Sequence, residues 1–413
     1  MLAITIKVAR QRFWRDPITL AGGLFLLLLV VQWANSNRPL IVDPLLQTWI
    51  YGSPPIAWLP SSVSRPEAAE MLRWFFPAWT IALAARHLPV PEASSRSRLL
   101  QAVIIAASVL AAGSMIQFAV ATYWGIGQIP SQSYFIASFG YANQAGSFFL
   151  LCFCIALGNT FSALLHQHSR QRQITTAICC LLCLGGALVT LSRSAILMAL
   201  ATIIIAVCYL LLVHRPEGGR AANFDRIMIA LATVVAVFLL FDPLFGRSVS
   251  EELGRRNRQM DGFSLPANWT YSAVDSIRPL YRTIAIGILR DHPWFGAGGW
   301  AARHLGMMYV PARLHPLLQT DGAANTHNDL LQFLSEFGFV GMALLGGVIA
   351  IMAAPMVNNS RAIMQSPRVF FCLLGLLLVM IHSTVDLPFR SPAVLFLWTL
   401  TLALTGGSTK VLK

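Results

Sequence analysis

The stretch Asn325–Gly341, NTHNDLLQFLSEFGFVG, organises the chain. It starts as a polar loop and continues into an apolar helix. Its first turns carry the polar side chains of His327, Asn328, Asp329, Gln332, Ser335 and Glu336. Helical spacing places Asn328, Gln332 and Glu336 on one face. Thr326, followed three residues later by an aspartate, resembles a capping box. Polar groups at membrane depth are costly, so this stretch is expected to hold a functional site.

The composition indicates a membrane protein. The chain has 413 residues, of which 56% are hydrophobic and only 11% charged, and this excludes an ordinary soluble protein. Apolar runs of roughly 17 to 25 residues can each cross a bilayer. Ten such runs lie near residues 18–34, 68–85, 99–122, 140–161, 174–191, 195–213, 227–241, 329–354, 369–386 and 392–408. We therefore expect an all-α polytopic integral membrane protein with about 10 transmembrane helices, and up to about 12.

The distribution of charge predicts the orientation. The net charge of +13 lies mainly in loops between the apolar runs, and no nucleic-acid-binding motif accompanies it. Alternate short loops are rich in Arg and Lys, so the positive-inside rule predicts cytoplasmic N- and C-termini. We expect N-terminal transmembrane helices over 1–241, one long, partly helical outer loop over 242–327, and C-terminal transmembrane helices over 328–413.

Three arginines of the predicted outer face are candidate anion ligands. Arg193 lies in the tight turn TLSRSA, where it either snorkels to the surface or binds an anion. Arg278 and Arg282 lie one turn apart in a predicted helix over 272–290. The sequence DHPWFGAGGW follows this helix. A Gly-rich loop can hold phosphate through its backbone N–H groups, but here the motif of a nucleotide site is missing.

Four further polar residues lie at predicted outer ends of spans. Asn143, in FGYANQAG, belongs either to a close helix contact or to a pocket for a headgroup or sugar. The last outer turn, HSTVDLPFRSP, contains His382, Asp386 and Arg390. His382 is expected to be a buried neutral histidine that a helix neighbour satisfies. Asp386 and Arg390 either pair with each other or contribute to the site.

These residue types favour one kind of chemistry. Arginine forks and helix N-termini suit phosphate oxygens. An imidazole such as that of His327 can accept a proton from a hydroxyl at neutral pH. The sequence has no Ser-His-Asp set, no HExxH motif and no carboxylate pair at metal-ligand spacing, so neither a metal nor another cofactor is expected. The simplest reaction has a membrane-borne phosphate or diphosphate as leaving group and a hydroxyl as nucleophile.

The pattern H-N-D-x-L-Q-x-x-x-E-x-G-x-x-G, from His327 to Gly341, resembles the signature of the O-antigen ligase and polymerase superfamily. The H-P-x-x-G-x-G that ends the segment Arg278–Gly298 resembles the part that precedes this signature, and TLSRSA, FGYANQAG and HSTVDLPFRSPA resemble other motifs of the family. The resemblance covers about residues 135–405. One departure is Arg282, which stands where the family usually has an aromatic residue.

The resemblance implies an enzyme that moves glycan from undecaprenyl diphosphate to a hydroxyl acceptor, on the outer side of the bacterial inner membrane. His327 would be the catalytic base. The diphosphate or another part of the substrate would bind to Arg193, Arg278, Arg282, Asn328, Asp329 and Arg390. Structural or supporting roles would fall to Asn143, Gln332, Glu336, His382 and Asp386. The partners would be the bilayer, a lipid-linked oligosaccharide donor and an acceptor.

Two questions stay open at the level of sequence. The acceptor is lipid A-core for a ligase and a second lipid-linked glycan for a polymerase, and the motifs do not separate these two activities. A transporter or flippase for a lipid-linked sugar, or a structural component of a polysaccharide-export complex, is the alternative to an enzyme. A transporter would predict charges at the bilayer midplane and repeat symmetry, and neither is evident.

Overall fold

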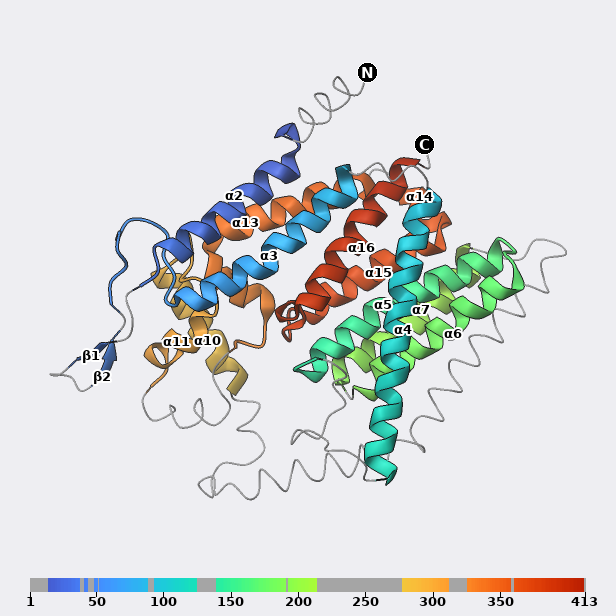
Figure 1. Cartoon of the computed structure of the whole chain (residues 1–413), viewed down its shortest axis with the longest axis horizontal. Coiled ribbons are helices and arrows are strands. Elements are labelled where there is room, and N and C mark those ends of the chain that lie inside the picture. Colours follow the sequence, from blue (N-terminus) through green and yellow to red (C-terminus); the bar gives the residue numbers. More distant parts are fainter. Residues whose placement is uncertain are drawn as a thin grey trace. The chain divides into compact units, whose positions relative to one another are not determined.

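The computed structural model describes residues 14–37, 41–43, 48–50, 52–87, 93–124, 139–190, 192–213, 277–311, 325–357 and 360–411. Apart from one short hairpin, the regular elements in this part of the chain are helices (Figure 1), which confirms the all-α class. The chain divides into two compact units. Unit 1 consists of Met1–Pro89, Tyr271–Asn358 and Ser383–Gly407, and unit 2 of Val90–Thr270, Asn359–His382 and Ser408–Lys413.

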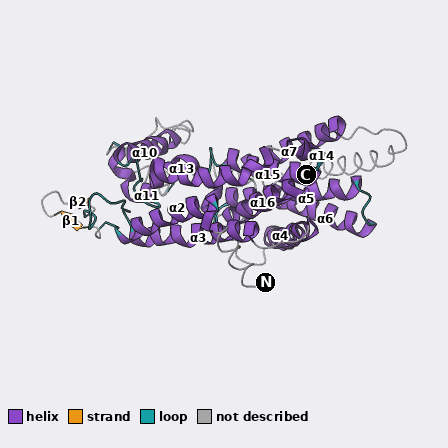
Figure 2. Cartoon of the chain, turned by 90° about the horizontal axis from the view of Figure 1, so that it is seen from above, coloured by secondary structure: helices purple, strands orange, loops and turns teal. Residues whose placement is uncertain are grey.

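Unit 1 contains the predicted site stretch. Its elements are α2 (Pro17–Ala34), β1 (Ile41–Asp43), β2 (Thr48–Ile50), α3 (Arg65–His87), α10 (Ile277–Asp291), α11 (Ala301–Leu305), η1 (Gly306–Tyr309), α13 (Asp329–Val357), η3 (Pro388–Arg390) and α16 (Pro392–Val411). The two strands pair antiparallel, with Val42 opposite Trp49. Helices α2, α3 and α13 run alongside one another, with α2 touching both of the others (Figure 2).

Unit 2 is built around one central helix. Its elements are α4 (Ala93–Trp124), α5 (Ala142–Leu165), α6 (Arg170–Val189), α7 (Arg193–Val213), α14 (Ser360–Gln365) and α15 (Pro367–His382). Helix α5 is buried along almost its whole length, because α4, α6, α7 and α15 all pack against it. The turn between α6 and α7 is short, as TLSRSA predicts.

Six helices of the described part are long and apolar enough to cross a membrane, namely α2, α5, α6, α7, α13 and the apolar part of α4. The chain is therefore a multi-pass membrane protein. The predicted spans at 68–85, 369–386 and 392–408 correspond to α3, α15 and α16, which are helical but are either more polar or shorter. The predicted span at 227–241, and 242–276 and 312–324 of the predicted outer loop, lie outside the described residues. The total of ten to twelve spans thus stays a prediction.

Helix α13 is broken near its first third. Gly338 has φ 64° and ψ −172°, so the helix from Asp329 stops there and a second helix continues to Val357. A break of this kind leaves carbonyl and N–H groups without their helical partners. In a membrane such groups must be satisfied by the protein itself.

The segment DHPWFGAGGW supplies those partners. The N–H groups of Phe339 and Val340 donate to the carbonyls of Pro293 and Trp294, at 2.8 and 3.0 Å. In the other direction, the N–H groups of residues 297 and 298 donate to the carbonyls of residues 335 and 336, at 3.0 and 2.9 Å. We call residues 293–298 the elbow. Its glycines serve this backbone contact, because a Cβ on Gly296 would lie 2.2 Å from the carbonyl carbon of Glu336.

Replacing Gly338 by alanine is expected to destabilise unit 1 by roughly 1 to 3 kcal/mol, because alanine is strained at this φ. A Cβ there would also lie 2.4 Å from the carbonyl carbon of Trp294. Gly346→Ala is the matched control, since a Cβ at Gly346 meets nothing within 4 Å and alanine favours a helix. The midpoint of thermal denaturation in detergent measures both variants. A Gly338→Ala midpoint equal to that of Gly346→Ala would contradict the role of the break.

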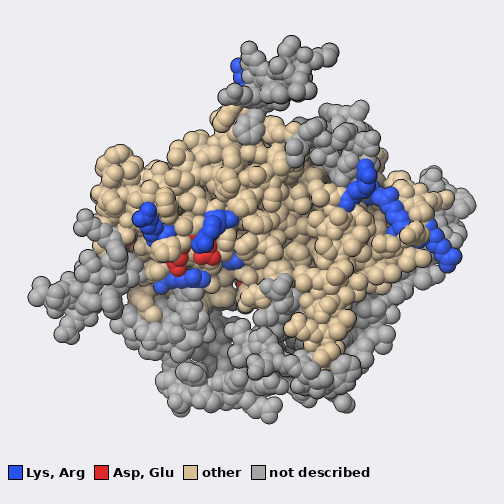
Figure 3. All heavy atoms as spheres, viewed as in Figure 1, with Lys and Arg blue, Asp and Glu red and all other residues tan. Residues whose placement is uncertain are grey.

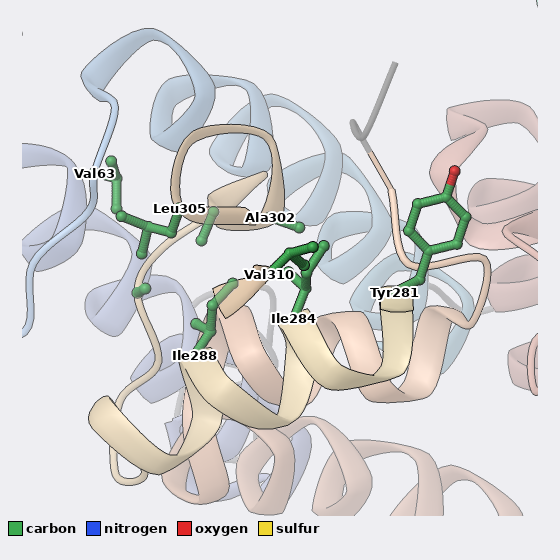
Figure 4. Packing of buried hydrophobic residues seen from close by; sticks show 9 residues of the cluster. Val63, Tyr281, Ile284, Ile288, Ala302, Leu305 and Val310 are labelled. Carbon is green, nitrogen blue, oxygen red and sulfur yellow. The ribbon is translucent and has the colours of Figure 1, made fainter. Parts of the chain in front are cut away.

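A small hydrophobic core holds α10 against the elbow. Figure 4 shows its side chains, which come from α10, from the elbow and α11, from the residue after η1, and from the segment before α3. They are Val63, Tyr281, Ile284, Ile288, Ala297, Ala301, Ala302, Leu305 and Val310, all buried. Val63 also donates its backbone N–H to the carbonyl of Ala297, at 3.1 Å. The elbow therefore fixes α10 and α13 in one assembly.

Candidate functional site

His327 lies in the turn that precedes α13. Its φ is 50°, in the left-handed region. Asn328 is the N-cap, because its Oδ1 accepts a hydrogen bond from the N–H of Leu331 at 2.9 Å. The capping box expected from Thr326 is therefore wrong by two residues. Thr326 Oγ1 donates instead to the carbonyl of Asn328, at 3.1 Å.

The polar face of α13 is buried and bonded internally. Gln332 Oε1 accepts from the N–H of Thr326 at 3.0 Å, and Gln332 Nε2 donates to Glu336 Oε1 at the same distance. Glu336 Oε1 also accepts from the N–H of Trp300 at 2.9 Å. From α2, Gln32 Nε2 donates to the carbonyls of Phe295 and Glu336, at 2.8 and 3.2 Å. This face therefore connects the turn of His327 to the helix break.

Asp329 fastens the last predicted outer turn to the start of α13. Its Oδ2 accepts from the N–H of Phe389 at 2.7 Å. Its own N–H donates to the carbonyls of Ser383 and Asp386, at 2.9 and 3.2 Å. Asn328 Nδ2 adds a bond to the carbonyl of Thr384, at 2.7 Å. The turn 383–390 is thus held directly beside His327.

Arg390 occupies the centre of this network. Its Nη2 donates to Glu336 Oε2 at 2.7 Å, and its Nε lies 3.5 Å from Asp329 Oδ1. The guanidinium carbon lies 4.6 Å from the ring centroid of Trp300 and 4.5 Å from that of Phe333, as in cation–π contacts. The side chains of Arg390, Asp329 and Glu336 are all at most 1% exposed. One buried guanidinium therefore pairs with two buried carboxyl groups.

His327 is the accessible member of the site, since a third of its side chain is exposed. Its Nδ1 lies 3.8 Å from Asp386 Oδ1, and the Asp386 side chain is only 5% exposed. The Tyr281 ring of α10 lies against the imidazole, with 5.3 Å between ring centroids. An imidazole placed between an aromatic ring and a buried carboxylate can take up a proton and keep its orientation while doing so.

Helix α10 brings arginines to the same region. Tyr281, which contacts His327, is preceded three residues earlier by Arg278 and followed at once by Arg282. The Arg282 side chain is exposed. Arg278 lies in the first turn of α10, where its backbone is described and its side chain is not. Among the described residues, no group of three or more His, Cys, Asp or Glu side chains could hold a metal ion.

A comparison with family models finds a match over residues 178–346, to the family described as O-antigen ligase. This match supports the O-antigen ligase and polymerase superfamily. This family is one of enzymes that transfer glycans. The matched segment contains Arg193, Arg278, Arg282 and the whole polar face from His327 to Glu336. A comparison with curated proteins gives no match.

The remaining residues predicted from this family resemblance lie in unit 2, and they are described there alone. Arg193 is the first residue of α7 and is exposed. Asn143 is in the first turn of α5, where its Nδ2 donates to Tyr141 Oη at 2.8 Å. His382, at the end of α15, is fully buried, and its Nδ1 lies 2.7 Å from Ser147 Oγ of α5. His382 thus has the helix neighbour that the sequence suggests.

Two residues beside the candidate site escaped the sequence analysis. Tyr281 supplies an aromatic ring beside His327, although Arg282 occupies the position where the family usually has an aromatic. Trp300, at φ 57°, lies between the guanidinium groups of Arg303 and Arg390, at 3.8 and 4.6 Å from its ring centroid. The sequence did contain a signal for Tyr281, because it directly precedes Arg282, the position where the family usually has an aromatic residue. No local signal identified Trp300, because its partners are distant in sequence.

Proposed function

We propose that the chain transfers a glycan from undecaprenyl diphosphate to a hydroxyl acceptor, on the outer side of the bacterial inner membrane. The observation that carries this proposal is the position of His327. It is partly exposed at the start of a broken helix, beside Asp386 and beside the helix that carries Arg278 and Arg282. This arrangement supplies a base and cations at one place.

The proposed reaction is a displacement at the anomeric carbon of the donor sugar. His327 takes the proton of the acceptor hydroxyl as its oxygen forms a bond to that carbon. The bond between the anomeric carbon and the phosphate oxygen breaks, and the electron pair leaves with undecaprenyl diphosphate. The Asp386 carboxylate stabilises the imidazolium, because opposite charges at 3.8 Å attract each other strongly in a partly buried site.

The leaving diphosphate needs positive charge. Arg278 and Arg282 are proposed to bind its oxygens, since guanidinium groups form bidentate hydrogen bonds with phosphate. In such a reaction the cations act mainly by positioning the donor and stabilising the charge that develops. The exposure of Arg282 supports this role, because its side chain can reach a ligand. Arg193, in unit 2, stays a candidate on the family resemblance alone.

The buried residues are proposed to act differently from the sequence-based expectation. Asp329 and Arg390 were grouped with the substrate ligands, but their burial and mutual pairing support a structural role. Together with Gln332 and Glu336, they hold the turn of His327 and the turn of Asp386 in register. Asn328 caps the helix, and this use of its side chain supports a structural role as well.

Lipid analysis of a deletion strain tests the function and separates its two forms. A polymerase predicts that lipid-linked single repeats accumulate, because chain extension stops. A ligase predicts long lipid-linked chains together with bare lipid A-core, because only the final transfer stops. Plasmid-borne wild-type chain should restore the product in either case. Unchanged glycolipids in the deletion strain would contradict both forms, and a lipid-linked sugar retained on the cytoplasmic side would indicate a flippase.

A further inference from the structure

The described part of unit 2 contains no Asp or Glu at all. Residues 93–124, 139–190, 192–213 and 360–382 include seven arginines but not one carboxylate side chain. On the face seen in Figure 3, Asp and Glu spheres lie among one group of Lys and Arg spheres, whereas another blue group has no red neighbour. Among the described residues of this unit, Arg170, Arg172 and Arg368 therefore have no carboxylate to pair with.

Several of these cations converge where α5 ends and where α6 and α15 begin. Arg172 lies in the first turn of α6, and Arg368 is the second residue of α15. Their positive charges interact unfavourably with each other. His168 lies in the turn between α5 and α6. Burial lowers the pKa of His168, and the positive charges of Arg172 and Arg368 lower this pKa further. Arg170, at the start of α6, is exposed beside them.

The start of α15 and the turn of His168 are held in place by packing and hydrogen bonds. The α15 backbone approaches α5 so closely that a Cβ on Gly158 would lie 3.1 Å from the Cα of Arg368. Gln173 Nε2 fixes the turn by donating to the carbonyl of His168, at 2.9 Å. Arg368 Nη1 donates to Ser97 Oγ at 3.2 Å. The Arg368 Nε, however, is buried without an acceptor among the described residues. Like charges fixed together in this way are unfavourable unless an anion joins them.

Two helix N-termini add to the positive potential. Helices α6 and α15 both begin here, and neither has an acidic residue in its first turn. The N-cap of α6, Ser169, makes no side-chain capping bond. Free N–H groups and the helix dipole favour an anion at such an end. The position also fits a membrane headgroup, because candidate spans α5 and α6 end at this point.

We infer that Arg172 and Arg368, with Arg170 and His168 beside them, form a binding site for a phosphate group, that of an anionic phospholipid or free phosphate. Basic pockets between membrane helices bind lipid headgroups by this chemistry. The site is separate from the proposed transfer reaction and does not depend on it. If these arginines only set the orientation of the chain in the membrane, they would not need to lie close to one another.

Native mass spectrometry of the purified full chain tests the site. The probes are phosphatidylglycerol, phosphatidylcholine and inorganic phosphate, each titrated against detergent-solubilised protein. We expect phosphatidylglycerol to bind more tightly than phosphatidylcholine. In R172Q/R368Q this affinity should fall by about 25-fold, because each Arg near an anionic lipid contributes roughly a fivefold factor. Displacement of the lipid by millimolar inorganic phosphate would assign the site to free phosphate, whereas retention of the lipid would assign it to phospholipid.

The matched control is R65Q/R73Q, which removes two exposed arginines of α3 and the same total charge. It should keep the preference for phosphatidylglycerol. Equal affinities in wild type, R172Q/R368Q and the control would overturn the proposal. If the double variant does not fold, Arg172→Gln alone, at a partly exposed position, should still lose about fivefold in affinity.

Discussion

Replacing His327 by alanine is expected to reduce glycan transfer by roughly 100- to 10,000-fold, because a positioned general base contributes a factor of this size. The imidazole is a third exposed and lies in the turn before the helix, so its removal should cost little packing beyond the contact with the Tyr281 ring. The assay is product formed by reconstituted protein from a lipid-linked glycan donor and an acceptor lipid, with equal amounts of folded protein.

His166→Ala is the matched control for this variant. His166 is an exposed histidine at the end of α5, in the other unit, and its loss should leave transfer unchanged. Wild-type product levels in His327→Ala would remove the imidazole from the reaction. Asp386→Asn gives a second measurement. It keeps the shape of the side chain and removes the charge near Nδ1, so we expect slower transfer by a correctly folded protein.

Replacing Arg390 by methionine is expected to produce the largest loss of stability, roughly 3 to 5 kcal/mol, since it leaves buried charges without a partner. Asp329 and Glu336 both face Arg390, and all three side chains are shielded from solvent. The variant would also lose the contacts with Trp300 and Phe333. The midpoint of thermal denaturation and the yield of folded protein measure this effect.

A second substitution separates charge from packing. In R390M/E336Q one of the two uncompensated carboxylates is neutral, so part of the lost stability should return. Arg65→Met is the control, because Arg65 is an exposed arginine 4.8 Å from the Trp33 ring centroid and should contribute less than about 1 kcal/mol. If Arg390→Met and Arg65→Met denatured at the same temperature, Arg390 would not be the centre of the network.

The sequence predicted the polar face of α13 well, because helical spacing is a local property. Gln332 and Glu336 share a buried face, as expected. The start of the helix was misplaced by two residues, since Thr326 and Asn328 are both good caps and only the surrounding turn selects between them. The apolar runs that lie within the described residues likewise form helices at the expected places, while hydropathy alone does not state how many of them cross a bilayer.

The break in α13 could not be predicted from the sequence. A glycine in an apolar helix is normally a packing residue, so Gly338 gave no warning. The hydrogen bonds that make the break stable come from residues 293–298, about 40 residues earlier. The partners of Arg390 are equally remote, as Glu336 precedes it by 54 residues. Long-range partners of this kind leave no periodic trace in the sequence.

The elbow has a consequence for the segment that follows it. The chain leaves the helix break at Gly298 and is back beside it at Asn325, since Gly298 bonds to the carbonyl of Glu336 and Gln332 Nε2 reaches Asn325 Oδ1 at 3.5 Å. Both ends of the intervening segment are thus hydrogen-bonded to adjacent turns of α13. Doubling the length of a closed segment adds only about 0.6 kcal/mol. A longer segment between these anchors would therefore cost little stability, and His327 would keep its place.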